Sequence, residues 1–142
     1  MADKILLIDD EIDFVETLAE RMRARGMNVS TSTSAKEALE KIDKESFDAI
    51  VLDLQMPGMD GLEALKRIKE KNSKLQVILL TGQATVEKSI QAMKLGALDL
   101  LEKPADIEML IEKIKQASTE KMIQVTKENE LKIKKIIGGK AW

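Results

Sequence analysis

Three short runs of apolar, mostly aliphatic residues constrain the fold of this chain more than any other feature. They cover Lys4 to Ile8, Phe47 to Leu52 and Gln76 to Leu80. Each run is apolar at almost every position rather than at alternate positions, which indicates strands buried on both faces, the pattern of a parallel sheet. Parallel neighbours need crossover connections, so the sequence predicts helices packed on both faces of this sheet.

Helical patterns occupy the segments between these strands. Apolar residues recur at helical spacing from Ile12 to Met22 and stop before Gly26, and Ser34 to Glu37 is a capping box that predicts a helix through about Lys44. The other predicted elements are a weaker strand at Met27 to Thr31, helices at Gly61 to Glu70 and Thr85 to Leu95, and a short strand at Asp99 to Leu101. The order βαβαβαβαβα predicts a doubly wound α/β fold that binds ligands at the carboxyl ends of its strands.

Composition excludes several function classes. The chain has 142 residues, which suggests one domain, and it contains no cysteine and no histidine. Disulfides, thiolate chemistry, imidazole catalysis and imidazole metal ligands are therefore excluded. The net charge of −2 provides no overall positive field that would favour binding to nucleic acid. The apolar runs are too short to span a bilayer. With no secretory signal visible, we expect a cytoplasmic protein that by itself binds neither nucleic acid nor membrane.

Three carboxylates are predicted to meet at one edge of the sheet. Asp9 and Asp10 directly follow the first strand, and Asp53 directly follows the third. Carboxylates this close repel one another unless a cation or a proton compensates their charge. A hard divalent ion with oxygen ligands is the natural remedy, and Mg²⁺ is the best candidate.

A lysine and a threonine are predicted to join these acids. Lys103 follows the fifth strand and Thr81 closes the fourth, so both lie at the same edge. An ammonium group can neutralise a phosphate oxygen or bridge to Asp53, and the hydroxyl adds a neutral donor. A carboxylate nucleophile, a metal, a fixed cation and a donor together form a phosphoryl-transfer site.

These motifs, in their order and spacing, resemble the receiver domains of two-component signalling. The resemblance runs from Asp3 to about Ser118 and is carried by Asp9-Asp10-Glu11, the segment from Asp53 to Gly61, Thr81-Gly82, Gly96-Ala97 and Lys103-Pro104. It implies a flavodoxin-like five-stranded parallel sheet in the order 2-1-3-4-5 with five helices, the last one extended. It also implies a receiver domain at residues 1–118, followed by a C-terminal helical extension or linker at residues 119–142.

The resemblance also implies a role for each site residue. Asp53 is the implied phosphoacceptor, Asp10, Asp53 and the backbone carbonyl of Gln55 bind Mg²⁺, Asp9 contributes through water, Thr81 is the switch hydroxyl and Lys103 binds the phosphoryl group. The implied donor is a histidine kinase or a phosphotransfer protein, with autophosphatase activity restoring the resting state. The output is then a changed interaction surface for a downstream effector or an output domain, and not catalytic turnover. A cis peptide before Pro104 is typical of the family.

One position departs from the family pattern. The residue after Asp99 is usually aromatic, and its ring moves together with the switch threonine, but here it is Leu100 and the chain has no tyrosine. We expect Leu100 to repack with smaller amplitude when Thr81 moves.

The segment after Ser118 allows two interpretations. Apolar residues continue at helical spacing, which predicts that the last helix runs from about Asp106 to Ile137 before Gly138-Gly139, roughly 45 Å in length. The members of this stripe are Ile111, Ile114, Met122, Val125, Ile133 and Ile136, interrupted by Ser118 and Asn129. A homodimer or partner contact through this helix and a linker to an output domain both remain open.

Other functions fit these residues less well than a receiver domain does. Asp9-Asp10-Glu11 alone could be first-turn acids that favour a helix dipole, but Asp53 and Lys103 at matching strand ends argue for a site. A phosphate-independent scaffold of the same fold is one alternative. An aspartyl phosphohydrolase, as in haloacid-dehalogenase-like enzymes, is another, but those enzymes carry a second acid where Gln55 stands here. A flavin site is weaker still, because the chain has no tyrosine and only Trp142, at its very end, to stack on the flavin ring.

Overall fold

The computed structural model describes residues 3–138, in which strands and helices alternate from β1 to α5. The strands are β1 (Lys4–Ile8), β2 (Asn28–Ser32), β3 (Ala49–Asp53), β4 (Val77–Thr81) and β5 (Asp99–Glu102). The helices are α1 (Ile12–Ala24), α2 (Ala35–Lys44), α3 (Gly61–Lys71), α4 (Val86–Lys94) and α5 (Ile107–Gly138). The predicted βαβαβαβαβα order is confirmed. Within the described residues, no helix is long and apolar enough to cross a membrane.

All five strands are parallel and lie in the order β2-β1-β3-β4-β5. The predicted order of the sheet is therefore confirmed. The chain runs outward from β1 to β2 and then crosses back to β3, so the winding direction changes between β1 and β3. In open α/β sheets, a crevice forms at this point outside the carboxyl ends of the strands, and ligands bind there.

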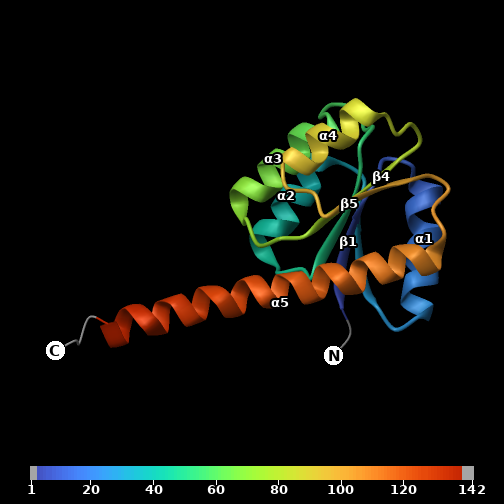
Figure 1. Cartoon of the computed structure of the whole chain (residues 1–142). Coiled ribbons are helices and arrows are strands. Elements are labelled where there is room, and N and C mark those ends of the chain that lie inside the picture. The colour runs from blue at the N-terminus through green and yellow to red at the C-terminus, as the bar shows by residue number, and fades with distance from the viewer. Residues whose placement is uncertain (1–2, 139–142) are drawn as a thin grey trace.

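Helices cover both faces of the sheet (Figure 1). Successive strand residues point to opposite faces. Ile5 and Leu7 of β1 pack with α1 and α5, whereas Leu6 and Ile8 pack with α2, α3 and α4. Because neither face meets solvent, the central strands are apolar at every position except one end residue each, which explains the runs seen in the sequence.

Hydroxyl side chains cap the starts of α2 and α4, and the Asp60 carboxylate caps the start of α3. The Ser34 hydroxyl accepts a hydrogen bond from the Glu37 amide at 3.2 Å, and the Thr85 hydroxyl accepts one from the Lys88 amide at 3.1 Å. Each cap satisfies an amide that has no partner within its own helix. The predicted helix start at Ser34 is confirmed, since α2 begins at Ala35, directly after this cap. The Glu37 carboxylate, the other half of the predicted capping box, pairs with Lys41.

The boundaries of four strands differ from the prediction by one or two residues. β2 lies one residue further along, at Asn28–Ser32, and β5 ends one residue later, at Glu102. β3 begins at Ala49 rather than at Phe47, although the Phe47 side chain is buried in the core. β3 and β4 each run one residue further than predicted, so Asp53 and Thr81 are the last residues of their strands. An apolar residue in the sequence indicates a buried side chain, whereas the end of a strand depends on backbone hydrogen bonds to the neighbouring strand. A residue such as Phe47 can therefore be buried without belonging to the strand.

The loop after β3 turns back sharply under the end of the strand. Gly58 has φ +88°, a left-handed conformation that favours glycine. The Gly61 amide donates to the Leu54 carbonyl at 3.0 Å. A Cβ atom at Gly61 would lie 2.4 Å from the Leu54 Cα, so only glycine fits this contact. The start of α3 is thereby held directly against the residue that follows Asp53.

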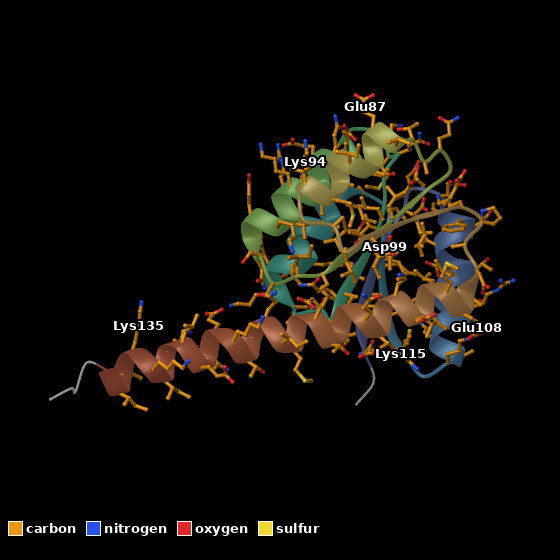
Figure 2. All side chains as sticks on the ribbon, in the orientation of Figure 1. Glu87, Lys94, Asp99, Glu108, Lys115 and Lys135 are labelled. Atoms are coloured by element: carbon orange, nitrogen blue, oxygen red, sulfur yellow. The ribbon has the colours of Figure 1, made fainter. Side chains whose placement is uncertain are left out.

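Helix α5 is long, as predicted, and spans 32 residues to Gly138. Leu110, Ile114 and Ala117 are buried against the sheet. The predicted stop includes Gly139, which lies outside the described residues, as does Trp142. The C-terminal part of α5 projects past the domain, with Lys135 on the projecting part (Figures 1 and 2).

Contacts between α5 and the domain continue beyond Ser118. The Ser118 hydroxyl donates to the Asp3 carboxylate at 2.9 Å, and the Lys121 ammonium donates to the Phe47 carbonyl at 2.5 Å. Further along, Glu128 forms an ion pair with Lys74. These contacts lie at the end of the sheet opposite to Asp53, so this part of α5 runs beneath the domain.

Candidate functional site

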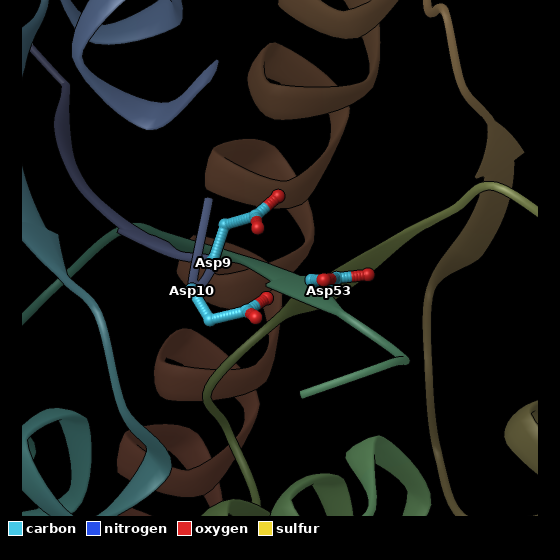
Figure 3. A group of neighbouring side chains, drawn as sticks. All are labelled: Asp9, Asp10 and Asp53. Atoms are coloured by element: carbon cyan, nitrogen blue, oxygen red, sulfur yellow. The ribbon is translucent and has the colours of Figure 1, made fainter. Parts of the chain in front are cut away.

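The structure brings Asp9, Asp10 and Asp53 together, as the strand topology predicts. Oxygen atoms of the three carboxylates lie within 4.8 Å of one another. Asp9 follows β1 and Asp53 ends β3, and both side chains are buried, while Asp10 is half-buried. Figure 3 shows the three carboxylates gathered at the ends of these two strands. A cation would relieve their mutual repulsion, so these three residues could hold a metal ion.

Backbone amides hold one oxygen of each buried carboxylate. The Glu11 amide donates to Asp9 Oδ1 at 2.9 Å, and the Gln55 amide donates to Asp53 Oδ1 at 3.1 Å. Each contact joins residues two apart, the pattern of an Asx turn. The local sequence after each strand therefore orients the carboxylate, and the Oδ2 atom of each is the one nearer to Lys103.

Lys103 reaches into the acidic cluster from the segment after β5. Its Nζ atom lies 2.7 Å from Asp9 Oδ2, 3.2 Å from Glu11 Oε1 and 3.8 Å from Asp53 Oδ2. The Lys103 amide donates to the Thr81 carbonyl at 2.7 Å, and the Lys103–Pro104 peptide is cis, as the resemblance implies. The predicted approach of Lys103 to Asp53 is confirmed, but its strongest contact is with Asp9.

The electrostatics of the site follow from burial and charge. Burial raises the pKa of Asp53 to about 6; the Gln55 amide and Lys103 oppose that shift, while Asp9 and Asp10 add to it. Burial by itself lowers the pKa of Lys103, but Asp9, Asp53 and Glu11 outweigh burial and raise it. The lysine therefore stays charged, and one ammonium faces three carboxylates. A proton on Asp53 or a bound cation would balance the excess negative charge.

Thr81 lies at the same edge with its side chain fully buried. Its hydroxyl accepts a hydrogen bond from the Gln83 amide at 3.2 Å and lies 3.4 Å from the Gln83 carbonyl. The Thr81 hydroxyl therefore contacts the backbone of the loop that follows β4. Open space surrounds the next residue, because a Cβ atom on Gly82 would have no atom within 4 Å. The predicted switch hydroxyl is thus near the cluster but not bonded to it.

Sequence reasoning missed two residues that contact Lys103. Glu11 belongs to the acidic motif but had no assigned role, and it pairs with Lys103 across the cluster. Phe14 was not considered, and its ring centroid lies 4.3 Å from Lys103 Nζ. One sequence signal is available for Phe14, which lies in the first turn of the helix that begins beside the acidic motif.

This chain is similar in sequence and in structure to response-regulator receiver domains. The family profile "Response regulator receiver domain" matches residues 5–115. The transcriptional regulatory protein ZraR of Escherichia coli (strain K12) is 38% identical over 122 residues, 86% of this chain and 26% of that protein. The chain therefore spans about a quarter of the length of this relative.

Two solved structures superpose on the described fold. A CheY-like receiver domain protein from Methanospirillum hungatei JF-1 has a TM-score of 0.82 at 28% identity, covering 87% of this chain and 99% of that one. A response regulator protein from Burkholderia pseudomallei has a TM-score of 0.76 at 30% identity, covering 89% of this chain and 75% of that one. The latter was solved with a phosphorylated aspartic acid, a calcium ion and citrate.

Proposed function

The chain belongs to the response-regulator receiver family, and on that premise we propose that Asp53 is the aspartate that accepts the phosphoryl group. Receiver domains are signalling phosphoacceptors of two-component systems and interact with histidine kinases. The observation that carries the assignment is the packing of Asp53 at the strand end, within 4.8 Å of two further carboxylates and 3.8 Å from Lys103. Within this cluster, Asp53 is the acid that ends the strand beside the point where the sheet changes winding direction.

The hydrogen bonds of Asp53 support its role as nucleophile. Oδ1 accepts the Gln55 amide, which leaves Oδ2 for attack on phosphorus. When a phosphohistidine is the donor, the P–N bond breaks, the Asp53 O–P bond forms, and the imidazole nitrogen keeps the electron pair and takes a proton. In autodephosphorylation, water attacks phosphorus and restores the carboxylate. The protein contributes mainly position and charge to both steps.

The donor set fits Mg²⁺. Two buried carboxylates and one half-buried carboxylate with a single lysine leave negative charge that a hard cation with oxygen ligands would balance. Asp10, Asp53 and the backbone carbonyl of Gln55 would hold the ion directly, and Asp9 would contribute through water. When bound, such an ion neutralises charge on the phosphoryl oxygens.

Lys103 and Thr81 would bind the phosphoryl group once it is on Asp53. Lys103 is only 14% exposed and already lies 3.8 Å from Asp53, so a short movement brings its ammonium to a phosphoryl oxygen. The Thr81 hydroxyl would leave the Gln83 loop and donate to another oxygen. This exchange of partners links modification to the β4–α4 loop, which begins directly after Thr81.

The output is proposed to be a changed interaction surface on α4, β5 and α5. On α4, Val86 is 78% exposed, and Ile90 and Met93 are each half exposed. Apolar side chains in a row on one helix suit a protein partner. The partner would be a downstream effector or an output domain, and the donor a histidine kinase or a phosphotransfer protein in the cytoplasm. The receiver unit would end near residue 118, with residues 119–142 acting as an extension or linker.

Intact-mass measurement after incubation with acetyl phosphate and Mg²⁺ tests this proposal. The wild-type chain should gain one phosphoryl group only when Mg²⁺ is present, and Asp53→Ala should gain none. Asp60→Ala, which removes an exposed helix-capping carboxylate outside the cluster, is the matched control and should still be modified. A wild-type chain that stays unmodified, with unchanged NMR spectra on addition of Mg²⁺ and beryllofluoride, would instead support the phosphate-independent scaffold.

A further inference from the structure

We propose that Phe14 is a positioning residue for phosphoryl transfer, whose ring face holds the Lys103 ammonium in place beside Asp53. This inference rests on the proposed function and adds a residue to it. Lys103 Nζ lies 4.3 Å from the centroid of the Phe14 ring, well within the range of a cation–π contact. The face of an aromatic ring carries negative potential, so it attracts the ammonium.

The ring attracts the ammonium electrostatically and offers no oxygen that would compete with a phosphoryl oxygen for its third N–H. An ammonium has three N–H donors. Asp9 at 2.7 Å and Glu11 at 3.2 Å accept two of them, whereas Asp53 at 3.8 Å is too far away for a hydrogen bond. A third carboxylate in place of the ring would bind the last donor. With Phe14 there, the last N–H remains available for a phosphoryl oxygen.

The position of Phe14 follows from the start of α1. Glu11 precedes this helix, and Phe14 lies in its first turn on the side that faces the strand ends. Phe14 is half-buried and lines a small cavity together with Asp9, Asp53 and Leu80. Lys103, with 14% exposure, is therefore enclosed by carboxylates on one side and by the ring on another. Partial exclusion of water strengthens a cation–π contact.

The second phenylalanine of the chain supplies an internal comparison. Phe47 also lies near a lysine, with Lys4 Nζ 5.3 Å from its ring centroid. That pair lies at the opposite end of the sheet from Asp53, because Phe47 precedes β3 and Lys4 begins β1. Changes in the ring electrons of Phe47 should therefore leave the chemistry at Asp53 unchanged.

Fluorinated phenylalanines incorporated at a single position test the proposal. Successive fluorine atoms weaken the negative face of the ring while nearly preserving its size. With fluorinated residues at Phe14, the rate of phosphorylation by acetyl phosphate should fall stepwise, and Phe14→Leu should be slower than wild type by about two- to five-fold. Acetyl phosphate is used as the donor because it is a small molecule, so any contribution of Phe14 to the binding of a protein donor does not affect the rate. The same fluorinated residues at Phe47 should leave the rate unchanged.

Two further measurements separate positioning from a general structural role. In a Lys103→Gln background, fluorination at Phe14 should have no effect on the residual rate, because the cation is gone. In the resting protein, the ε protons of Lys103 should resonate upfield through the ring current of Phe14 and lose that shift in Phe14→Leu. Phe14→Tyr, which retains the ring, should keep both the rate and the shift.

Different results would overturn different statements. A flat rate across the Phe14 fluorine series, with wild type phosphorylated on Asp53, would overturn the role of Phe14 alone. An equal fall in the Lys103→Gln background would also overturn it, since the effect would then not act through the lysine. A wild-type chain that accepts no phosphoryl group would overturn the proposed function and this role together.

Discussion

Neighbouring groups act in opposite directions on the ionisation of Asp53 in the resting site. Burial and the two neighbouring carboxylates favour its protonated form, and Lys103 and the Gln55 amide favour its ionised form. The Lys103 ammonium lies closer to the Asp9 carboxylate than to the Asp53 carboxylate. The resting site therefore holds Asp53 with incomplete compensation, a condition that a cation at the cluster would relieve.

This imbalance predicts how stability depends on pH without metal. The pKa of Asp53 in the folded state is about 6, above its ordinary value of 3.8, so the folded state binds this proton more tightly than the unfolded state. The contribution to stability is present below about pH 4 and is lost as pH rises to about 6. In EDTA, Asp53→Asn should therefore exceed wild type in free energy of unfolding above about pH 7, by an amount of order 2 kcal/mol, and should match it near pH 4.

Urea unfolding followed by circular dichroism across this pH range measures the effect. Asp13→Asn removes an exposed carboxylate of α1 outside the cluster and serves as the control for the change in net charge. Parallel pH profiles for wild type and Asp53→Asn would contradict the prediction.

Gly61 is required by close backbone packing rather than by conformation. A Cβ atom there would meet the Leu54 Cα at 2.4 Å and its carbonyl oxygen at 2.6 Å. Gly61→Ala should lower the free energy of unfolding by about 1–3 kcal/mol, because backbone atoms must shift. Gly82→Ala, whose Cβ meets no atom within 4 Å, should change it by less than about 0.5 kcal/mol. Equal denaturation midpoints for the two variants would refute this distinction.

At the scale of elements, β4, β5 and α4 form the part of the fold in which a change at Thr81 can spread. Thr81 ends β4, and Leu100 of β5 pairs with Leu79 of β4. Leu100 is half-buried and packs against the core cluster on the face covered by α2, α3 and α4. A residue with this partial burial can change its packing without opening the core.

Leu100 is therefore expected to repack when Thr81 moves, with smaller amplitude than the aromatic residue usual in the family. Methyl relaxation dispersion with Mg²⁺ and beryllofluoride should detect exchange on the microsecond to millisecond scale at Leu100. Leu7, which is buried on the opposite face of the sheet, should show none. Absence of exchange at Leu100 while Thr81 responds would rule out this coupling.

At the scale of the whole molecule, α5 carries surface that the domain does not cover. Contacts with the domain reach as far as the Glu128–Lys74 ion pair. Beyond it, Leu131, Ile133, Ile136 and Ile137 are each more than half exposed. Exposed apolar side chains at helical spacing suit association with another helix, and this keeps the sequence-based homodimer prediction open to test.

The homodimer prediction requires a mass that depends on concentration. Sedimentation equilibrium of the full chain should show dimers at high concentration, and Ile133→Ser with Ile136→Ser should remove them by deleting apolar contact. The control is Lys132→Ser with Lys135→Ser, two exposed lysines of the same helix segment, which should still associate. If the full chain stays monomeric at millimolar concentration, the homodimer prediction is wrong and the linker interpretation is favoured.

Sequence patterns alone predicted the order of the elements, a parallel sheet and the residues of the acidic cluster, and the family resemblance added the strand order. Continuous apolar runs separated by helical patterns allow few topologies, and in a parallel sheet every strand end lies at a known edge. Asp9, Asp53, Thr81 and Lys103 could therefore be placed together, because each follows or ends a strand.

The contacts among these side chains became known from the three-dimensional structure alone. Lys103 pairs first with Asp9, the Thr81 hydroxyl bonds to its own loop, and Phe14 lies beside the Lys103 ammonium. The contacts of α5 with Phe47 and Lys74 were equally absent from any sequence pattern. Such contacts join side chains from elements far apart in the chain, and their distances depend on how the layers pack rather than on local spacing or propensity.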